Sequence, residues 1–338
     1  MDGVPFIVLP IVFVVSCGLT WRIRSYCLAN GIVNIPNQRS SHTQIVARGG
    51  GVGFSVTFLA AMVGLGLTGV VSWRPAIALT GGGAIIGLTG WVDDRQGLTQ
   101  LTRIVLHLSA AVWAVEWIGG VPQLFPVPPV VALVIPVILI IAVAWLVNLY
   151  NFMDGTDGIA GIEAVTVALM SGALCTMAGV AVAGRVYYLL AAAVAGFLVW
   201  NWPPARIFMG DAGSGFLGFA FAATALWCAT DNKRLFWPCV ILLSVFIADA
   251  TTTLLRRMAK GERWYEPHRS HAYQKLARRA GHLRIALGVA AINVLLLGPV
   301  AWFAWRHPRL GFPLTLAVNA ALAVFALTVR DRAGESSS

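Results

Sequence analysis

The stretch Asn148-Leu-Tyr-Asn151-Phe-Met-Asp154-Gly-Thr-Asp157-Gly-Ile-Ala-Gly161 decides how the rest of the chain is interpreted. An apolar run from Val130 to Val147 precedes it, and a second run from Ile162 to Val180 follows it. Each run has about the length of a membrane-spanning helix, which needs ~20 apolar residues. Two carboxylates and two carboxamides therefore stand where a predicted span ends. Ionisable groups at such a place cost free energy and indicate a functional site.

The composition is that of an integral membrane protein. The chain has 338 residues, of which 58% are hydrophobic and 11% are charged, whereas soluble domains carry about 25% charged residues. The sequence therefore predicts one all-α membrane domain over residues 1–338, with about ten or eleven transmembrane helices. The predicted spans are 4–20, 50–71, 76–92, 101–118, 129–147, 159–180, 184–200, 213–229, 235–255, 284–304 and 311–329. The third and the seventh of these are the shortest.

The charge pattern predicts the orientation. Most of the 24 Lys and Arg residues fall in one set of alternate loops, and the positive-inside rule places those loops in the cytoplasm. The N-terminus is then outside. The net charge of +10 is explained by attraction to anionic lipid, so we expect no nucleic-acid partner. The polar motifs, which are 36–51, 93–94, 148–157, 208–214 and 268–274, all fall in the cytoplasmic set.

Asp93 and Asp94 close the third predicted span. Adjacent carboxylates at the lipid interface repel each other, and we expect them to interact with a metal or a phosphate group. The alternative is a solvated helix end neutralised by Arg95.

Asn148, Asn151, Asp154 and Asp157 recur at every third position. On a helix such a row drifts by about 60° per step, so one straight helix cannot aim all four at a single point. We expect the glycines to break the helix after Asp154. Helix capping by aspartate explains Asp157 alone.

Asp211 stands between glycines at the start of the eighth predicted span, in Phe208-Met-Gly-Asp211-Ala-Gly-Ser214. It is either a helix N-cap or a ligand of Mg²⁺, which takes one or two protein oxygens and fills its remaining positions with phosphate and water.

The most basic loop, residues 256–284, is predicted to bind substrate. Within it, His268, Arg269 and His271 are expected to bind a diphosphate, because guanidinium forks match phosphate oxygens. Arg48 precedes Gly49-Gly-Gly51, which is an anion site at a helix start or a flexible loop. Asp249 is interpreted as a hydrogen-bonded structural carboxylate with Arg256 as a candidate partner, and Glu163 is left unassigned.

These motifs, in this order, resemble those of the polyprenyl-phosphate N-acetylhexosamine-1-phosphate transferases, glycosyltransferase family 4. The resemblance extends from Pro36 to Gln274. The His268-Arg-Ser-His271 form looks like the bacterial branch that starts O-antigen or other surface polysaccharide.

The resemblance implies an all-α fold with a cytoplasmic-face active-site cleft, and transfer of HexNAc-1-phosphate from a UDP-HexNAc to undecaprenyl phosphate with release of UMP. It implies Mg²⁺, with Mn²⁺ as a substitute, and membrane lipid as a partner; a homodimer is left open. The roles that it implies are metal ligation by Asn151 and Asp211, catalysis by Asp93, Asp94, Asp154 and Asp157, and substrate binding by Asn148, Asn151, Arg48, His268, Arg269 and His271.

Two alternatives are kept. One is the phospho-MurNAc-pentapeptide transferase of peptidoglycan synthesis, and the other is a transporter of lipid-linked substrates. A transporter is expected to place polar groups near the bilayer midplane, whereas this chain places them at one face.

Overall fold

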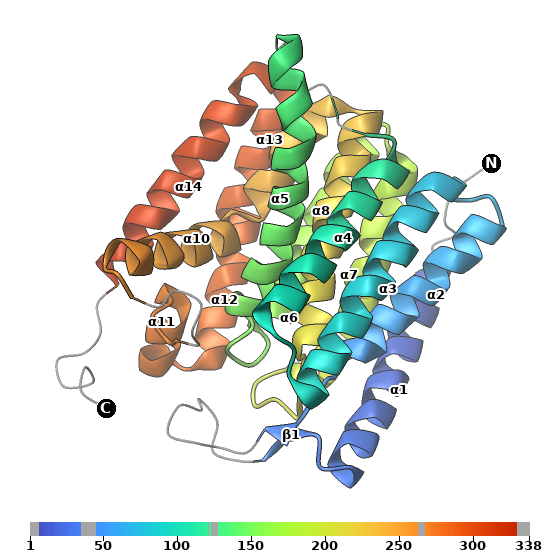
Figure 1. Ribbon diagram of the computed structural model, residues 1–338, viewed down its shortest axis with the longest axis vertical. Coiled ribbons are helices and arrows are strands. Elements are labelled where there is room, and N and C mark those ends of the chain that lie inside the picture. Colours follow the sequence, from blue (N-terminus) through green and yellow to red (C-terminus); the bar gives the residue numbers. More distant parts are fainter. Residues whose placement is uncertain (1–6, 35–44, 121, 123–127, 263–267, 330–338) are drawn as a thin grey trace.

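The computed structural model describes residues 7–34, 45–120, 122, 128–262 and 268–329, which form a helical bundle with one short sheet (Figure 1). Its longer helices are α1 (Val8–Ala29), α2 (Gly51–Leu67), α3 (Trp73–Gln96), α4 (Gln100–Ile118), α5 (Pro129–Met153), α6 (Ile159–Met177), α7 (Ala181–Asn201), α8 (Asp211–Asp231), α10 (Ser244–Ala259), α12 (His282–Ile292) and α14 (Gly311–Thr328). The shorter ones are α9 (Phe236–Leu242), α11 (Ala272–Ala280) and α13 (Gly298–Arg306). Two 3₁₀ turns, Lys233–Leu235 and Pro308–Leu310, and a π-helical segment, Asn293–Leu297, complete the helical elements.

The all-α membrane fold is confirmed. In the described part of the chain, nine helices are long and apolar enough to cross a membrane, or ten if α9 and α10 count as one bent span. The third and seventh predicted spans are longer than expected, at 24 and 21 residues. The short one is instead α2, whose 17 residues extend over about 26 Å.

The ninth predicted span, 235–255, is not one straight helix. α9 and α10 meet at an angle of 65° around Leu243, and Figure 1 shows α10 lying across the other helices. Hydropathy reports only that the segment is apolar, so the bend could not be predicted from it.

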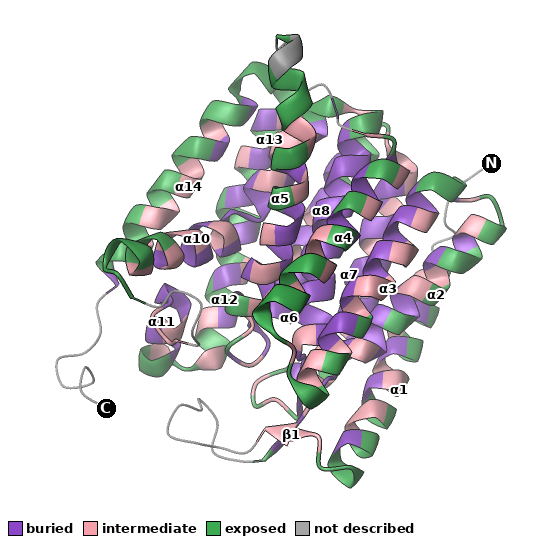
Figure 2. Ribbon diagram, viewed as in Figure 1, coloured by how far each residue is buried: buried purple, intermediate pink, exposed green. Residues whose placement is uncertain are grey.

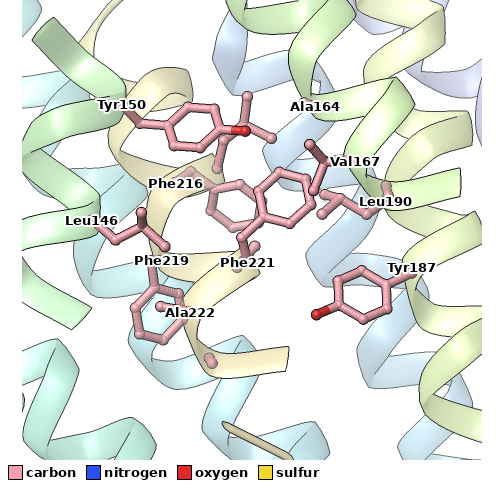
Figure 3. Close-up of a cluster of buried hydrophobic side chains, with 14 of the residues drawn as sticks. Leu146, Tyr150, Ala164, Val167, Tyr187, Leu190, Phe216, Phe219, Phe221 and Ala222 are labelled. Atoms are coloured by element: carbon pink, nitrogen blue, oxygen red, sulfur yellow. The ribbon is translucent and has the colours of Figure 1, made fainter. Parts of the chain in front are cut away.

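The centre of the bundle is α8, whose most apolar window is entirely buried (Figure 2). Its aromatic side chains fill the core, and Phe221 stacks on Tyr150 of α5 with ring centroids 5.7 Å apart (Figure 3). Glycines let the neighbouring helices approach: a Cβ on Gly218 would meet the backbone of α5, and one on Gly90 would meet the first turn of α8. The start of α8 is therefore fixed by its contact with α3.

A three-stranded sheet, which the sequence did not predict, covers the same end of α8 (Figure 1). Its strands are β1 (Val33–Asn34), β2 (Val46–Arg48) and β3 (Ile207–Phe208), with β2 in the middle. β2 pairs parallel to β3, with Arg48 opposite Phe208. The sheet thus places Arg48 opposite Phe208, which precedes Asp211 by three residues in the sequence.

The basic segment 256–284 is largely helical. It holds the end of α10, the whole of α11 and the start of α12. Residues 263–267 of this segment, and Pro36 at the start of the resemblance, lie outside the described residues.

Candidate active site

Arg48, at the end of β2, joins two aspartates from two helices. Its Nε lies 2.8 Å from Asp94 Oδ1 and its Nη2 lies 2.7 Å from Asp211 Oδ1. The Arg48 side chain is 38% exposed, while that of Asp94 is fully buried. Burial alone would lower the pKa of Arg48, but Asp94 and Asp211 raise it. The guanidinium is therefore a permanent charge that can also face a ligand.

Asp94, the last acidic residue of α3, caps α8. Its Oδ1 accepts a hydrogen bond of 3.0 Å from Asp211 N, and its Oδ2 accepts one of 3.3 Å from Ala212 N. The first amides of a helix lack partners within the helix, and a carboxylate there also favours the helix dipole. Gly210 has φ 75°, and a Cβ on it would collide with the Asp94 carboxylate. Hence Asp211 is not the N-cap that one interpretation of the sequence proposed.

Asn151 brings the end of α5 to Asp211. Its Nδ2 donates to Asp211 Oδ2 at 3.2 Å, and its Oδ1 accepts a hydrogen bond of 3.2 Å from Ser214 Oγ. Asn151 and Asp211, the two predicted metal ligands, are thus in direct contact.

Asp154 follows α5, and the helix does break there, as expected. Its carboxylate makes no hydrogen bond or ion pair with the described residues, yet it lies within electrostatic reach of Asp211, Asp94 and Arg48. Burial and then the Asp211 carboxylate raise the pKa of Asp154 well above its usual range, against the lowering effect of Arg48. Asp154 is thus the unpaired acid of the site.

Asp93 holds the turn between α3 and α4. Its Oδ1 accepts a hydrogen bond from Leu98 N, and its Oδ2 lies 3.1 Å from Arg103 Nη1. It is also close enough to Asp211 for their charges to interact. Arg103, which was not predicted as a site residue, adds a second cation. The available signal was its position, one turn into a predicted span that follows the Asp-Asp pair.

Asn148 faces α4 rather than the aspartates. Its Nδ2 donates to Ala144 O at 2.7 Å and lies 3.2 Å from His107 Nδ1. His107 was also missed, because a single histidine inside an apolar run has no distinctive spacing.

Asp157 fastens the turn before α6 to two other segments. Its Oδ2 accepts from Ala205 N at 3.1 Å and lies 3.2 Å from His282 Nδ1, at the start of α12. Asn201, another residue that was missed, accepts from Gly158 N at 3.0 Å and donates to Ile207 O at 2.9 Å. These contacts hold the turn against β3.

Asp249, on α10, caps α11 as Asp94 caps α8. It accepts hydrogen bonds from Ala272 N at 3.0 Å and Tyr273 N at 2.9 Å, and its Oδ1 lies 3.3 Å from His271 Nδ1. The prediction of a structural carboxylate is confirmed. Its partners are α11 and His271, and no contact with Arg256 was found among the described residues.

His268 stacks on His271, with ring centroids 4.9 Å apart, and its Nδ1 lies 2.9 Å from Ser270 Oγ. Burial, followed by the positive charges of His271 and Arg257, lowers the pKa of His268 to about 4. His268 is therefore neutral near pH 7. Arg269 beside it is half-buried.

Tyr273 ties this loop to the end of α5. Its hydroxyl donates to Phe152 O at 2.9 Å, and a Cβ on Gly155 would collide with that hydroxyl. The histidine loop and the Asn151–Asp157 turn are thereby held together, although the contacts of His268 and His271 do not reach Asp211. The cytoplasmic-face cleft that the resemblance implies stays a prediction.

The glycines after Arg48 form neither the anion site at a helix start nor the flexible loop that the sequence suggested as alternatives. Gly49 N and Gly50 N both donate to Phe208 O, and Gly51 N donates to Met209 O. These amides are engaged by the backbone of β3 and the following residue, so they are not open to an anion, and the segment is fixed rather than flexible.

Comparison with known proteins gives a consistent result. The family model described as "Glycosyl transferase family 4" matches residues 76–229, which include every aspartate of the site but neither Arg48 nor the histidine loop. A "Probable undecaprenyl-phosphate N-acetylglucosaminyl 1-phosphate transferase" of Bacillus subtilis is 28% identical over 266 residues, 76% of this chain and 73% of the relative. A "Decaprenyl-phosphate N-acetylglucosaminephosphotransferase" of Mycolicibacterium smegmatis is 29% identical over 322 residues, 83% of this chain and 78% of the relative.

A third relative bears on the peptidoglycan alternative. A "Phospho-N-acetylmuramoyl-pentapeptide-transferase" of Mycobacterium leprae is 41% identical, but over only 64 residues, 19% of this chain and 16% of the relative. The longer matches, which are to N-acetylglucosamine phosphotransferases, therefore favour that branch over the pentapeptide transferases.

The fold and the site define a polytopic membrane enzyme with an arginine-bridged acidic site at one end of its bundle. The match to the glycosyl transferase family 4 model and the similarity to the two N-acetylglucosamine phosphotransferases support the family expected from the motifs, the polyprenyl-phosphate N-acetylhexosamine-1-phosphate transferases.

Proposed function

We propose that this protein transfers N-acetylglucosamine 1-phosphate, or the 1-phosphate of a related N-acetylated sugar, from a UDP-sugar to undecaprenyl phosphate, with release of UMP. The observation that carries the proposal is the convergence of Arg48, Asp94, Asn151 and Asp211 at one end of the bundle. The sugar is taken from the names of the relatives, two of which contain N-acetylglucosamine. The reaction would be the first membrane step of a surface polysaccharide such as O-antigen, at the cytoplasmic face of the bacterial inner membrane.

The residues present fit a divalent cation. Asp94, Asp154 and Asp211 influence one another electrostatically, and Arg48 is the cation that acts on all three. This leaves a surplus of negative charge. No group of three His, Cys, Asp or Glu side chains in the described residues could hold a metal by itself, but Mg²⁺ is usually bound by one or two carboxylates together with substrate phosphates. Asp211 and Asn151 would hold Mg²⁺ or Mn²⁺, which supplies neutralisation of the charge that develops on the diphosphate.

The acceptor needs little activation. An oxygen of the lipid phosphate attacks the β-phosphorus of the UDP-sugar, the new P–O bond forms, and the bond to the bridging oxygen breaks so that UMP leaves. A phosphate monoester has its second pKa near about 6 and is mostly ionised at neutral pH. The protein therefore contributes chiefly position and charge, as in other phosphoryl transfers.

The structure supports separate tasks for the site residues. Asp94 holds both Arg48 and the start of α8, since both of its oxygens are engaged. Arg48 uses Nε and Nη2 for the aspartates, which leaves Nη1 for a phosphate oxygen. Asp154 has no partner among the described residues, and we propose that it contacts the substrate directly. His268 and Arg269 are proposed to approach the nucleotide diphosphate from the loop beside them.

The experiment is a UMP-release assay on the purified protein with undecaprenyl phosphate and, one at a time, UDP-GlcNAc, UDP-GalNAc and UDP-MurNAc-pentapeptide. The proposal predicts release with an N-acetylhexosamine donor, dependence on the lipid, and a lipid-diphosphate sugar as product. Decaprenyl phosphate, tested in parallel, reports on the acceptor length. Release with the pentapeptide donor alone would establish the peptidoglycan alternative, and no release with any donor would refute the proposal. A labelled sugar phosphate trapped on the protein without lipid would indicate a covalent two-step route instead of direct attack.

A further inference from the structure

Glu163 is a buried acid that the site does not use. It lies in the second turn of α6, with none of its surface exposed. Asn293, from the π-helical segment that follows α12, donates Nδ2 hydrogen bonds to Glu163 Oε2 at 2.5 Å and to Thr166 Oγ1 at 2.9 Å. The three residues form a polar contact between α6 and α12 inside the apolar bundle.

Two atoms of this contact have no partner. Glu163 Oε1 and Asn293 Oδ1 are both buried, and neither makes a hydrogen bond in the described part of the chain. As an ionised carboxylate and a carboxamide, both atoms are acceptors, so they cannot satisfy each other. A buried polar atom without a partner is costly.

Nothing nearby compensates an ionised Glu163. No Lys, Arg or His forms an ion pair with it among the described residues, and no charged side chain acts on it from the helices packed around α6. The titratable neighbour is Tyr150 on α5, whose hydroxyl lies within electrostatic reach of Glu163. An isolated charge in an apolar interior is strongly unfavourable, and the group takes up a proton instead.

We propose that Glu163 is a protonated carboxylic acid that forms a two-hydrogen-bond pair with Asn293. Its Oε1–H donates to Asn293 Oδ1, while its Oε2 accepts from Asn293 Nδ2. One proton thus satisfies both orphaned atoms at once. Glu163 is a stable proton-binding site inside the membrane domain at neutral pH.

The pair has a definite place in the fold. α6 and α12 are already joined at one end, where Asp157 contacts His282, and the Glu163–Asn293 pair joins them again deeper in the bundle. Asn293 begins a π-helical segment, and such turns often occur at functional positions. The pair therefore fixes α12, and with it the adjoining α11, relative to the helix that follows the Asp154–Asp157 turn.

The test compares E163Q with E163L and uses no transfer activity, so it stands or fails independently of the proposed function. Glutamine reproduces the protonated acid, because its Nε2–H donates to Asn293 Oδ1 and its Oε1 accepts from Nδ2. We expect E163Q to keep the melting temperature of the wild type and E163L to lower it, because leucine leaves the Asn293 amide unpaired.

Infrared difference spectra at pH 7 then identify the protonation state. The wild-type minus E163Q spectrum should contain the carbonyl band of a protonated carboxylic acid, shifted in D₂O. The matched control is E262Q, which removes a glutamate paired with Arg257 and should show only carboxylate bands. Carboxylate bands in place of the carboxylic-acid band in the wild-type minus E163Q spectrum would overturn the proposal. A melting temperature of E163Q as low as that of E163L would overturn it too.

Discussion

The carboxylate of Asp94 accepts a hydrogen bond from the backbone amide of Asp211, 117 residues further along the chain. The same carboxylate binds Arg48. One buried side chain of α3 therefore fixes both the first turn of α8 and the cation that neutralises the site. This relationship gives Asp94 a positional task that adjacent carboxylates in a sequence do not indicate.

Asp94→Ala should destabilise the fold as well as stop the reaction. Loss of a helix cap costs about 2 kcal/mol at the upper end of measured values, so the thermal unfolding temperature in detergent should fall. Asp94→Asn is the matched variant, because its amide oxygen still accepts a hydrogen bond while the pairing with Arg48 is weakened. We expect its unfolding temperature to lie nearer that of the wild type. Equal unfolding temperatures for Asp94→Ala and the wild type would show that the cap is not stabilising.

Arg48→Lys should lower kcat/KM although the charge is kept. A lysine has a single ammonium group and cannot bridge Asp94 and Asp211 with two separate nitrogens. A lost hydrogen bond to a charged group is worth about 1.5–3 kcal/mol, or roughly tenfold to a hundredfold in rate. Arg74→Lys, at the other end of α3, is the control and should leave the rate unchanged. Wild-type kinetics in Arg48→Lys would contradict the bridging role.

Asp249→Ala should loosen α11. The amides of Ala272 and Tyr273 lose their acceptor, so hydrogen–deuterium exchange in peptides that cover residues 272–280 should become faster. Arg256→Ala serves as the comparison, because no contact between Arg256 and Asp249 was found. Exchange in the same peptides of Arg256→Ala should match that of the wild type. Faster exchange in Arg256→Ala but not in Asp249→Ala would contradict the assignment of Asp249 as the cap of α11.

His268 should make stability depend on pH on the acid side of neutrality. Its pKa in the folded protein is about 4, whereas that of an exposed histidine is about 6.5. The unfolded chain therefore binds the extra proton between these values, and stability falls as the pH is lowered from about 6.5 to about 4. His268→Gln should show a shallower fall of the unfolding temperature across this window. An identical pH profile for the two proteins would contradict the lowered pKa.

The sequence predicts the membrane domain well because hydropathy and loop charge are local properties. It also predicts candidate residues for the site, since carboxylates and amides at helix ends are conspicuous in an apolar chain. The partners of Asp94 and Asp249 could not be predicted, because they are backbone amides of helices far along the chain. When only the local sequence is considered, an aspartate next to a helix start, such as Asp211, is interpreted as the cap of that helix.

Other features carry too weak a signal. The sheet that positions Arg48 consists of strands of two or three residues, which are too short for alternation to be detected. The bend between α9 and α10 occurs at Leu243, without a proline or glycine at that position. His107 and Asn201 act through single long-range contacts, and a lone polar residue in an apolar run does not reveal its partner.

The most direct test of the central claim is UMP release by Asp211→Asn during a titration with Mg²⁺. Asp211 contacts Arg48 and Asn151, and asparagine keeps the shape of the side chain while removing the charge that the proposed Mg²⁺ site requires. Asp231→Asn places the same substitution at the opposite end of α8, where the side chain is exposed. The account predicts no Mg²⁺-dependent release by Asp211→Asn and normal release by Asp231→Asn. Near-normal release by Asp211→Asn at the same Mg²⁺ concentrations would contradict it.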